Sequence, residues 1–350
     1  MKKFFFLVAC ASLMVIGAKA QTAEELFKAG KAQFDRYDKL IGEYFIAQQQ
    51  NPDAADPTAA ERATLLIGGY EQLQKALALD TVFEVNKDGT PKIDKKTGAQ
   101  KFKTKFSKDI VPMLTGHVND IINVGNTYIQ ANDYAAALKA FRFYNTVMNS
   151  PIGAKVPAKP ETLSEVAFFE GYSAYQVKDY IGAFTAFANA MKLGYTDNQV
   201  ADFRNSSLAN VIQEFCDAKK FDEATACIDN VLAAYPNVGL FHDMKGYIVE
   251  QKDGILAAES FYKAATQVDP AFGNGFFDLG RVIYEKAEKV IEANPTATNA
   301  DLKPKLVPLY NEALPLFKKA QELDSQNSNT QIKRFIDDIE YKLELLGASK

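Results

Sequence analysis

The chain has 350 residues, of which 47% are apolar, so it can bury a substantial core in one large domain or two ordinary ones. Beyond the first 20 residues, 37 basic residues stand against 44 acidic ones, and this net charge of −7 argues against nucleic acid as the main partner. Only Cys216 and Cys227 lie in that part, too few for a disulfide-stapled scaffold, so stability must come from packing.

Residues 1–20 have the pattern of a cleaved secretory signal. Two lysines precede an apolar run over 4–18, and residues 18–20 read Ala-Lys-Ala, which fits the small-x-small cleavage rule. A lipoprotein signal at Cys10 is the competing interpretation, and the apolar run that continues past it argues against lipidation. No later stretch approaches the ~20 apolar residues needed to span a bilayer. The sequence predicts an exported protein, periplasmic or secreted after cleavage following Ala20.

The next segment, 21–80, is predicted to form a degenerate helical repeat. Apolar residues at helical spacing from Phe27 to Phe45 predict a long first helix, and YEQLQKALALD fits a second helix. Residues 81–108 then form an insert in which Gly89 and Gly98 mark turns between short alternating runs, as in a loop or hairpin. Eight lysines stand there against three acidic residues, a net charge of +5. This basic insert either docks a partner, folds over its own neighbours or is a solvated surface loop.

A helical pattern then repeats between residues 109 and 327. Ala258, Tyr262, Ala265 and Pro270 are spaced by 4, 3 and 5 residues, and Ala224, Ile228, Val231 and Pro236 repeat those spacings 34 residues earlier. These residues resemble the tetratricopeptide repeat (TPR), a helix-turn-helix unit with Leu-Gly and Tyr in its first helix and Ala, Phe, Ala and Pro in its second. The predicted units are 118–151, 164–197, 205–238, 239–272 and 273–327.

The last unit carries an insert with Pro295, Pro304 and Pro308 between its two helices, and Pro315 is expected to kink the second helix or to move its start later. Residues 328–350 are predicted to form a capping helix and tail, which a solenoid needs to cover its last apolar face. The resemblance therefore implies an all-α, right-handed superhelical solenoid of about six stacked antiparallel helix pairs with a C-terminal cap.

The sequence contains no pattern typical of a catalytic, cofactor or metal site. His117 and His242 are far apart, and neither metal-ligand spacings nor a phosphate-binding glycine loop nor a nucleophile elbow is present. We therefore expect neither an enzyme nor a bound cofactor or metal. Cys216 and Cys227 fall on opposite surfaces of one predicted helix pair, which favours two unpaired thiols.

In a stack of such units the first helices line a concave groove, and we take its residues as the candidate partner-binding site. The groove is rich in aromatic and amide side chains and carries one cation, without the basic clamp of family members that bind a C-terminal carboxylate. Such a surface suits extended protein segments held by apolar anchors and backbone hydrogen bonds. The candidate residues are Asn126, Phe168, Tyr172, Tyr175, Gln213, Tyr247, Phe277, Arg281 and Tyr284.

The function predicted from these residues is a non-catalytic protein–protein interaction scaffold or adaptor in the cell envelope, whose partner is another protein or a peptide segment. The alternative is an exported peptide- or glycan-binding protein. A purely structural interpretation also remains for the aromatic residues, because the same rings can pack between neighbouring first helices.

Overall fold

The computed structural model describes residues 21–51, 58–197, 199–324 and 329–348. The predicted signal peptide, residues 1–20 with Cys10, lies outside these described residues. The expected mature N-terminus, Gln21, lies within them. The chain divides into two compact units, Met1–Val200 and Ala201–Lys350. None of the described helices has both the length and the apolar character needed to cross a membrane.

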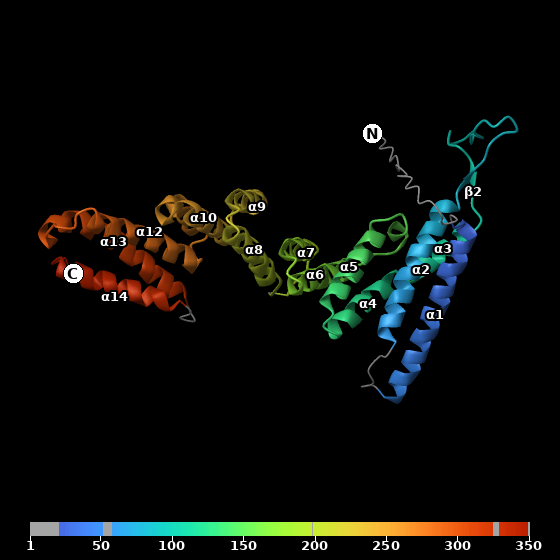
Figure 1. Cartoon of the computed structure of the whole chain (residues 1–350), viewed down its shortest axis with the longest axis horizontal. Coiled ribbons are helices and arrows are strands. Elements are labelled where there is room, and N and C mark those ends of the chain that lie inside the picture. Colours follow the sequence, from blue (N-terminus) through green and yellow to red (C-terminus); the bar gives the residue numbers. More distant parts are fainter. Residues whose placement is uncertain (1–20, 52–57, 198, 325–328, 349–350) are drawn as a thin grey trace. The chain divides into compact units, whose positions relative to one another are not determined.

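Unit 1 consists mainly of antiparallel helix pairs (Figure 1). The pairs are α1 with α2, α4 with α5 and α6 with α7; α3 precedes α4, and a short hairpin follows α2. The elements are α1 (Ala23–Gln50), α2 (Ala59–Leu79), β1 (Val82–Phe83), β2 (Phe102–Lys103), α3 (Ser107–Gly116), α4 (Val118–Gln130), α5 (Tyr134–Met148), η1 (Gly153–Lys155), α6 (Pro160–Gln176) and α7 (Tyr180–Lys192).

Unit 2 continues the same organisation and ends in a cap. Helix α10 packs with α11 and α12 with α13, while α14 covers the apolar face of the last pair. The elements are α8 (Gln199–Asp217), which begins at the boundary, α9 (Phe221–Ala234), α10 (Gly239–Asp253), η2 (Ile255–Ala258), α11 (Glu259–Val268), α12 (Gly273–Glu292), α13 (Asn299–Leu323) and α14 (Thr330–Leu345). The predicted all-α fold of stacked antiparallel helix pairs is confirmed.

Small residues and aromatic rings alternate where the two helices of a pair cross. A Cβ added at Gly125 would lie 2.6 Å from the Phe141 ring, and one at Gly246 would lie 2.5 Å from the Tyr262 ring. The same contact joins Gly171 to Phe187. In all three pairs the glycine precedes the ring by 16 residues. The absence of a glycine side chain therefore lets the helices approach, and the ring fills the space beside the glycine backbone.

The turn between the helices has a fixed backbone conformation in three of the units. Asn132, Lys178 and Lys219 have φ angles of 58°, 63° and 56°, in the left-handed region that most side chains avoid. In the first two units the next aspartate caps the second helix, since Asp133 accepts a hydrogen bond from Ala136 N and Asp179 accepts one from Gly182 N.

The prediction that a proline-containing insert delays the second helix of the last repeat, 273–327, was wrong. Helix α13 starts earlier than predicted, at Asn299, and runs through Pro304, Pro308 and Pro315. Its start is fixed by a capping box, in which Thr298 Oγ1 accepts from Asp301 N and the Asp301 carboxylate accepts from Thr298 N at 2.9 Å. Burial of its apolar stripe against α12 and α14 offsets the backbone hydrogen bonds that the prolines remove.

Candidate functional site

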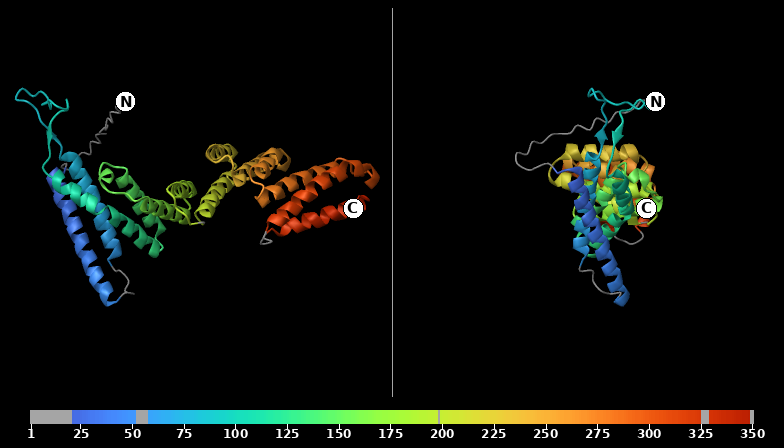
Figure 2. Two further views of the ribbon diagram at one scale, coloured as in Figure 1. Left: turned by 180° about the vertical axis from the view of Figure 1, so that it is seen from behind. Right: turned by 90° about the vertical axis from the view of Figure 1, so that its right-hand side faces the viewer.

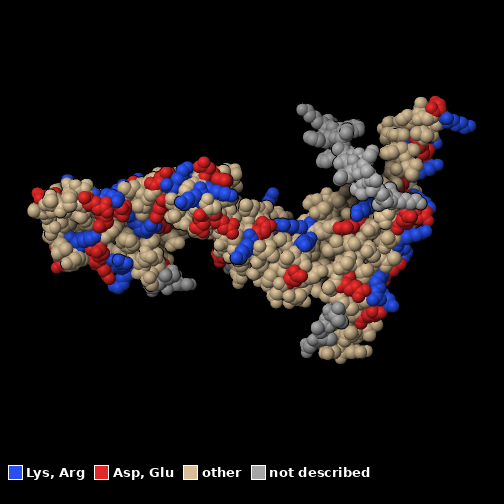
Figure 3. Space-filling view, in the orientation of Figure 1, with Lys and Arg blue, Asp and Glu red and all other residues tan. Residues whose placement is uncertain are grey.

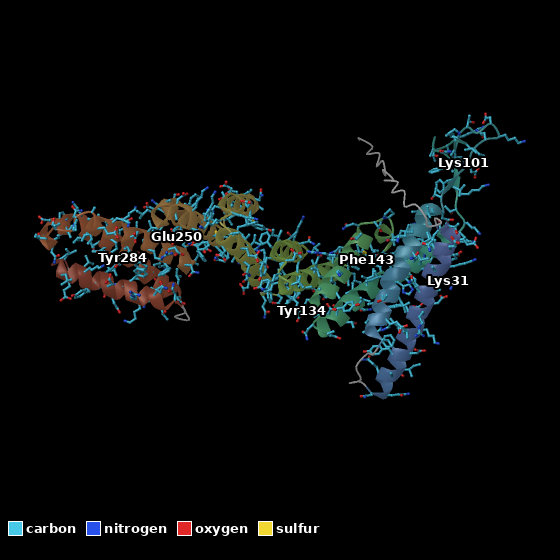
Figure 4. The ribbon with its side chains drawn as sticks, in the orientation of Figure 1. Lys31, Lys101, Tyr134, Phe143, Glu250 and Tyr284 are labelled. Atoms are coloured by element: carbon cyan, nitrogen blue, oxygen red, sulfur yellow. The ribbon has the colours of Figure 1, made fainter. Side chains whose placement is uncertain are left out.

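The candidate aromatic residues of unit 1 contact rings on neighbouring helices. Phe168 stacks on Tyr195, with ring centroids 4.5 Å apart, and Tyr175 meets Tyr180 edge to face at 5.5 Å. Tyr172 lies 5.7 Å from Tyr134, which Figure 4 labels at the start of α5. All three candidate rings remain half-buried rather than buried.

These contacts differ from the structural interpretation given to the sequence. The rings that they contact lie on the second helices of the pairs or just beyond them. The structural interpretation instead placed the candidate rings between successive first helices. The remaining candidate of unit 1, Asn126, lies half-buried on α4. The first-helix face of unit 1 therefore presents partly covered aromatic rings. None of the candidate residues there is charged.

Two of the candidates in unit 2 do not belong to an open surface. Phe277 is only 9% exposed and packs against Phe317 and Phe335. Tyr284 donates a hydrogen bond to Asp338 of α14 at 2.6 Å and accepts one from Lys342 Nζ at 2.5 Å. Their assignment as groove residues is corrected, because the capping helix covers this end of the first-helix face.

The other three candidates of unit 2 come together around one cavity. Gln213 of α8, Tyr247 of α10 and Arg281 of α12 line a hollow of about 250 Å³. The Tyr247 hydroxyl donates to Gln213 Oε1 at 2.8 Å, which fixes the amide. The full lining is Ala209, Ile212, Gln213, Asp243, Met244, Tyr247, Tyr262, Asp278 and Arg281. We call this hollow the α8–α10–α12 pocket.

Carboxyl groups outnumber the single cation at this pocket. Arg281 donates to Glu250 Oε1 at 2.6 Å and to Asp278 Oδ1 at 2.7 Å, so its charge is already balanced. Glu250, labelled in Figure 4, also accepts a hydrogen bond from the Tyr262 hydroxyl at 2.6 Å. The remaining acid, Asp243, has a shielded Oδ1 atom with no hydrogen-bond partner in the described part of the chain.

Asp243 is the acid of this pocket whose proton affinity changes most. Burial away from water raises its pKa to about 8, and the neighbouring Asp278 carboxylate adds to the effect. The pKa of Asp278 is also raised by burial, but Arg281 favours its charged form. At neutral pH the shared proton therefore lies mainly on Asp243, and a cation entering the pocket would displace it.

A larger hollow of about 1120 Å³ lies along α13 and α14, but its charged lining is mostly engaged in ion pairs. Lys318 contacts Glu340 at 2.7 Å and Lys319 contacts Glu322 at 2.9 Å. Because those charges neutralise one another at the surface, we place the candidate site in the α8–α10–α12 pocket.

The candidate set drawn from the sequence left out the acids of this pocket. Asp243 and Glu250 are seven residues apart on α10, and Asp278 precedes Arg281 by three residues on α12, spacings that place each pair on one helical face. That spacing was a usable signal. The convergence of the two faces was not visible, because it depends on how α10 and α12 pack.

The two cysteines of this unit are unpaired, as predicted. Burial raises the pKa of both the Cys216 and the Cys227 thiol, which keeps them protonated and poorly nucleophilic at neutral pH. No cluster of His, Cys, Asp and Glu in the described part of the chain has a geometry that fits a metal ion.

Comparison with known proteins adds solved structures only, since no protein-family model and no curated protein matches the chain. A crystal structure of a TPR repeats protein from Bacteroides fragilis is 20% identical, with 64% of this chain and 98% of that chain covered and a TM-score of 0.38. The TPR protein YrrB, described as having an unusual peptide-binding site, is 13% identical over 63% of this chain and 96% of that chain, with a TM-score of 0.34.

A TPR2AB-domain:pHSP90 complex of yeast Sti1 matches 92% of this chain and 98% of that chain at 10% identity, with a TM-score of 0.29. These solved structures are TPR proteins, but their similarity is too low to carry an argument about this chain. The fold described above rests on the helix pairs of the chain itself.

Proposed function

We propose that the chain is a non-catalytic interaction scaffold that holds a protein segment on the first-helix face of unit 2 and takes a lysine or arginine side chain of that segment into the α8–α10–α12 pocket. The observation that carries the proposal is the shielded, unpartnered Oδ1 of Asp243 beside a cavity with three nearby carboxyl groups and one guanidinium.

A cationic side chain would satisfy the Asp243 oxygen that the free protein leaves without a hydrogen-bond partner. An ammonium or guanidinium group can donate to both Asp243 and Asp278, and charge-assisted hydrogen bonds of this type are stronger than neutral ones. The Tyr247 ring, which lines the pocket, supplies an apolar contact for the aliphatic part of the same side chain. Because Asp243 must ionise to bind a cation, the proposal also predicts that binding strengthens as the pH rises toward about 8.

An array of extended peptides that differ only in one central residue tests the proposal with the purified chain. We expect retention of peptides with Lys or Arg at that position and about tenfold weaker retention of the matched Gln peptides, the loss of one charged contact. Asp243→Asn should remove the preference, whereas Asp222→Asn, at a site 90% exposed, should keep it.

A glycan array is the second arm of that experiment. Retention of glycans, with no peptide retained, would favour the alternative of an exported glycan-binding protein. Equal retention of Lys and Gln peptides would overturn the pocket as the recognition site.

We also propose export to the periplasm or beyond, supported by the residue pattern of 1–20. The N-terminal residue of the protein purified from cells tests this directly: Gln21 is expected, and Cys10→Ser should leave export and solubility unchanged. An unprocessed Met1, or a shift from the membrane to the soluble fraction in the Cys10 variant, would contradict it.

A further inference from the structure

A small β flap, residues 82–103, projects from unit 1 and uses none of the residues of the proposed peptide site. Strands β1 and β2 pair antiparallel with Phe83 opposite Phe102, and the chain between them adds the bridges Val85–Pro91 and Ile93–Gln100. At the junction three backbone hydrogen bonds join all three segments: Lys92 N donates to Glu84 O at 3.0 Å, Lys101 N to Lys92 O at 2.7 Å and Glu84 N to Lys101 O at 2.7 Å.

The alternation of side chains along these segments gives the flap two different faces. Glu84, Lys92 and Lys101 at the junction share one face, where Glu84 accepts a hydrogen bond from Lys92 Nζ at 2.8 Å. Their sequence neighbours point to the opposite face, and five of these six neighbours are apolar. They are Phe83, Val85, Pro91, Ile93 and Phe102, with Gln100 as the sixth.

The apolar face is open to solvent. Phe83, Val85, Ile93 and Phe102 are 59%, 58%, 49% and 59% exposed, and the only ring near Phe83 in the described part is Phe102, at 6.4 Å. The flap extends beyond the ends of α1, α2 and α3 in every view of the molecule (Figure 1, Figure 2). It therefore does not fold over its own neighbours, one of the possibilities that the sequence left open.

The base of the flap is nonetheless held firmly. The buried Asp80 carboxylate accepts hydrogen bonds from Lys105 N, Phe106 N and Ser107 N and from the Ser107 hydroxyl, at distances from 2.7 to 2.9 Å. Phe106 in turn stacks on Phe27 of α1, with centroids 4.9 Å apart. A loop fixed at its base and apolar on one face has the character of a docking element rather than that of a solvated connection.

Positive charge is concentrated around this apolar face. Glu84 is paired with Lys92 and Lys103, and Asp94 with Lys101 at 3.8 Å, while Asp88 accepts hydrogen bonds from Thr90 and has no ion-pair partner among the described residues. Lys87, Lys95 and Lys96, at the two turns, have no ion-pair partner among the described residues. Lys101 is labelled on the flap in Figure 4, and in Figure 3 both basic and acidic side chains mark its outer end beside a largely uncharged surface.

We infer that the flap docks on an anionic lipid surface. A bilayer interface accepts aromatic and aliphatic side chains without requiring a complementary shape, and anionic headgroups attract nearby lysines. A protein partner is less well matched, because five side chains on a two-stranded projection offer neither a concave site nor the roughly 800 Å² per partner of a stable interface. The proposal concerns peripheral attachment and is independent of the pocket in unit 2.

Cosedimentation of the purified chain with vesicles tests the inference. We expect binding to phosphatidylcholine vesicles that contain phosphatidylglycerol, weak binding to phosphatidylcholine alone, and a loss of binding at high salt. Phe83→Ser with Phe102→Ser should lower the partition coefficient about tenfold or more, as should Lys87→Gln, Lys95→Gln and Lys96→Gln together.

Matched controls separate the flap from the rest of the surface. Ile181→Ser removes an apolar side chain that is 59% exposed elsewhere, and Lys139→Gln, Lys155→Gln and Lys263→Gln remove the same charge outside the flap. Both should bind like the wild type, and all variants should melt at similar temperatures. Equal loss in the flap and control variants would overturn the inference.

Insertion of the apolar face has a direct reporter, because the chain contains no tryptophan. Phe102→Trp should show a blue-shifted emission on anionic vesicles and quenching by lipids brominated in their acyl chains. Tyr341→Trp, at a site 59% exposed in unit 2, should show neither. Unchanged Phe102→Trp emission, or crosslinking of the flap to an acidic protein in place of lipid binding, would refute docking on a membrane.

Discussion

At the scale of single residues, the closeness of the helix pairs depends on positions that carry no side chain. Gly246 lies under the Tyr262 ring, whereas a Cβ added at Gly42, on the exposed side of α1, would meet no described atom within 4 Å. The same residue type therefore has opposite energetic consequences at the two sites, which a comparison of two substitutions can measure.

Gly246→Ala should destabilise the protein by about 1–3 kcal/mol, because the new methyl group must displace a buried ring. Gly42→Ala should stabilise it by about 0.5–1 kcal/mol, since alanine loses less backbone entropy in a helix and meets no obstacle. Chemical denaturation of both variants measures the difference. Similar free energies of unfolding would contradict the pairing of Gly246 with Tyr262.

Asp243 makes the stability of unit 2 depend on pH. Its pKa in the folded protein, about 8, is above the ordinary value of 3.8, so the folded state binds the proton more tightly than the unfolded state. Stability should therefore fall as the pH rises from about 4 to about 8.

Asp243→Asn removes this dependence. The free energy of unfolding of the variant should exceed that of the wild type by about 1 kcal/mol or more at alkaline pH and by less at acid pH. Thermal melting at both pH values measures it. Asp222→Asn is the control, and a pH-dependent gain of equal size there would show that the effect does not come from the pocket.

At the scale of elements, α13 shows a helix whose length is set by packing rather than by propensity. Its stripe of Leu302, Leu306 and Tyr310 is buried, while Pro304 and Pro308 lie on the exposed side. The prolines remove backbone hydrogen bonds from the interior of the helix, and the buried stripe keeps the helix continuous.

Replacing Pro308 by Ala should therefore stabilise the protein, by about 1–3 kcal/mol, because an exposed helix position regains a backbone hydrogen bond at no cost in packing. Pro160→Ala should change little, since Pro160 lies at the start of α6, where a missing N–H is tolerated. Melting temperatures compare the two. A destabilised Pro308 variant would mean that the ring itself contributes to packing.

At the scale of the whole molecule, the candidate groove residues separate into those that hold the fold and those that face an open pocket. Phe277→Ala should cost about 3 kcal/mol or more of unfolding free energy, because it leaves a cavity beneath α14. Tyr247→Ala should cost less and should weaken capture of Lys peptides, since its ring lines the pocket. A large melting loss for Tyr247→Ala, with capture unchanged in the folded fraction, would refute the proposed site.

The sequence by itself predicted the helix pairs and the closing helix, and it favoured unpaired thiols. These features follow from local rules: the spacing of Gly125 and Phe141, the aspartate caps at Asp133 and Asp179, and the apolar periodicity of residues 332–343. Local rules fail at α13, because burial of the apolar stripe outweighs the propensity of Pro304 and Pro308 to end a helix.

Only the tertiary structure decided which groove residues meet. Phe277 and Arg281 are one helical turn apart on α12, yet α14 covers the first, while the second reaches Glu250 on another helix. The exposed apolar face of the flap was equally invisible, since it arises where three short segments pair at Glu84, Lys92 and Lys101. Contacts between residues distant in the chain depend on packing and strand register, which the period of a single segment does not specify.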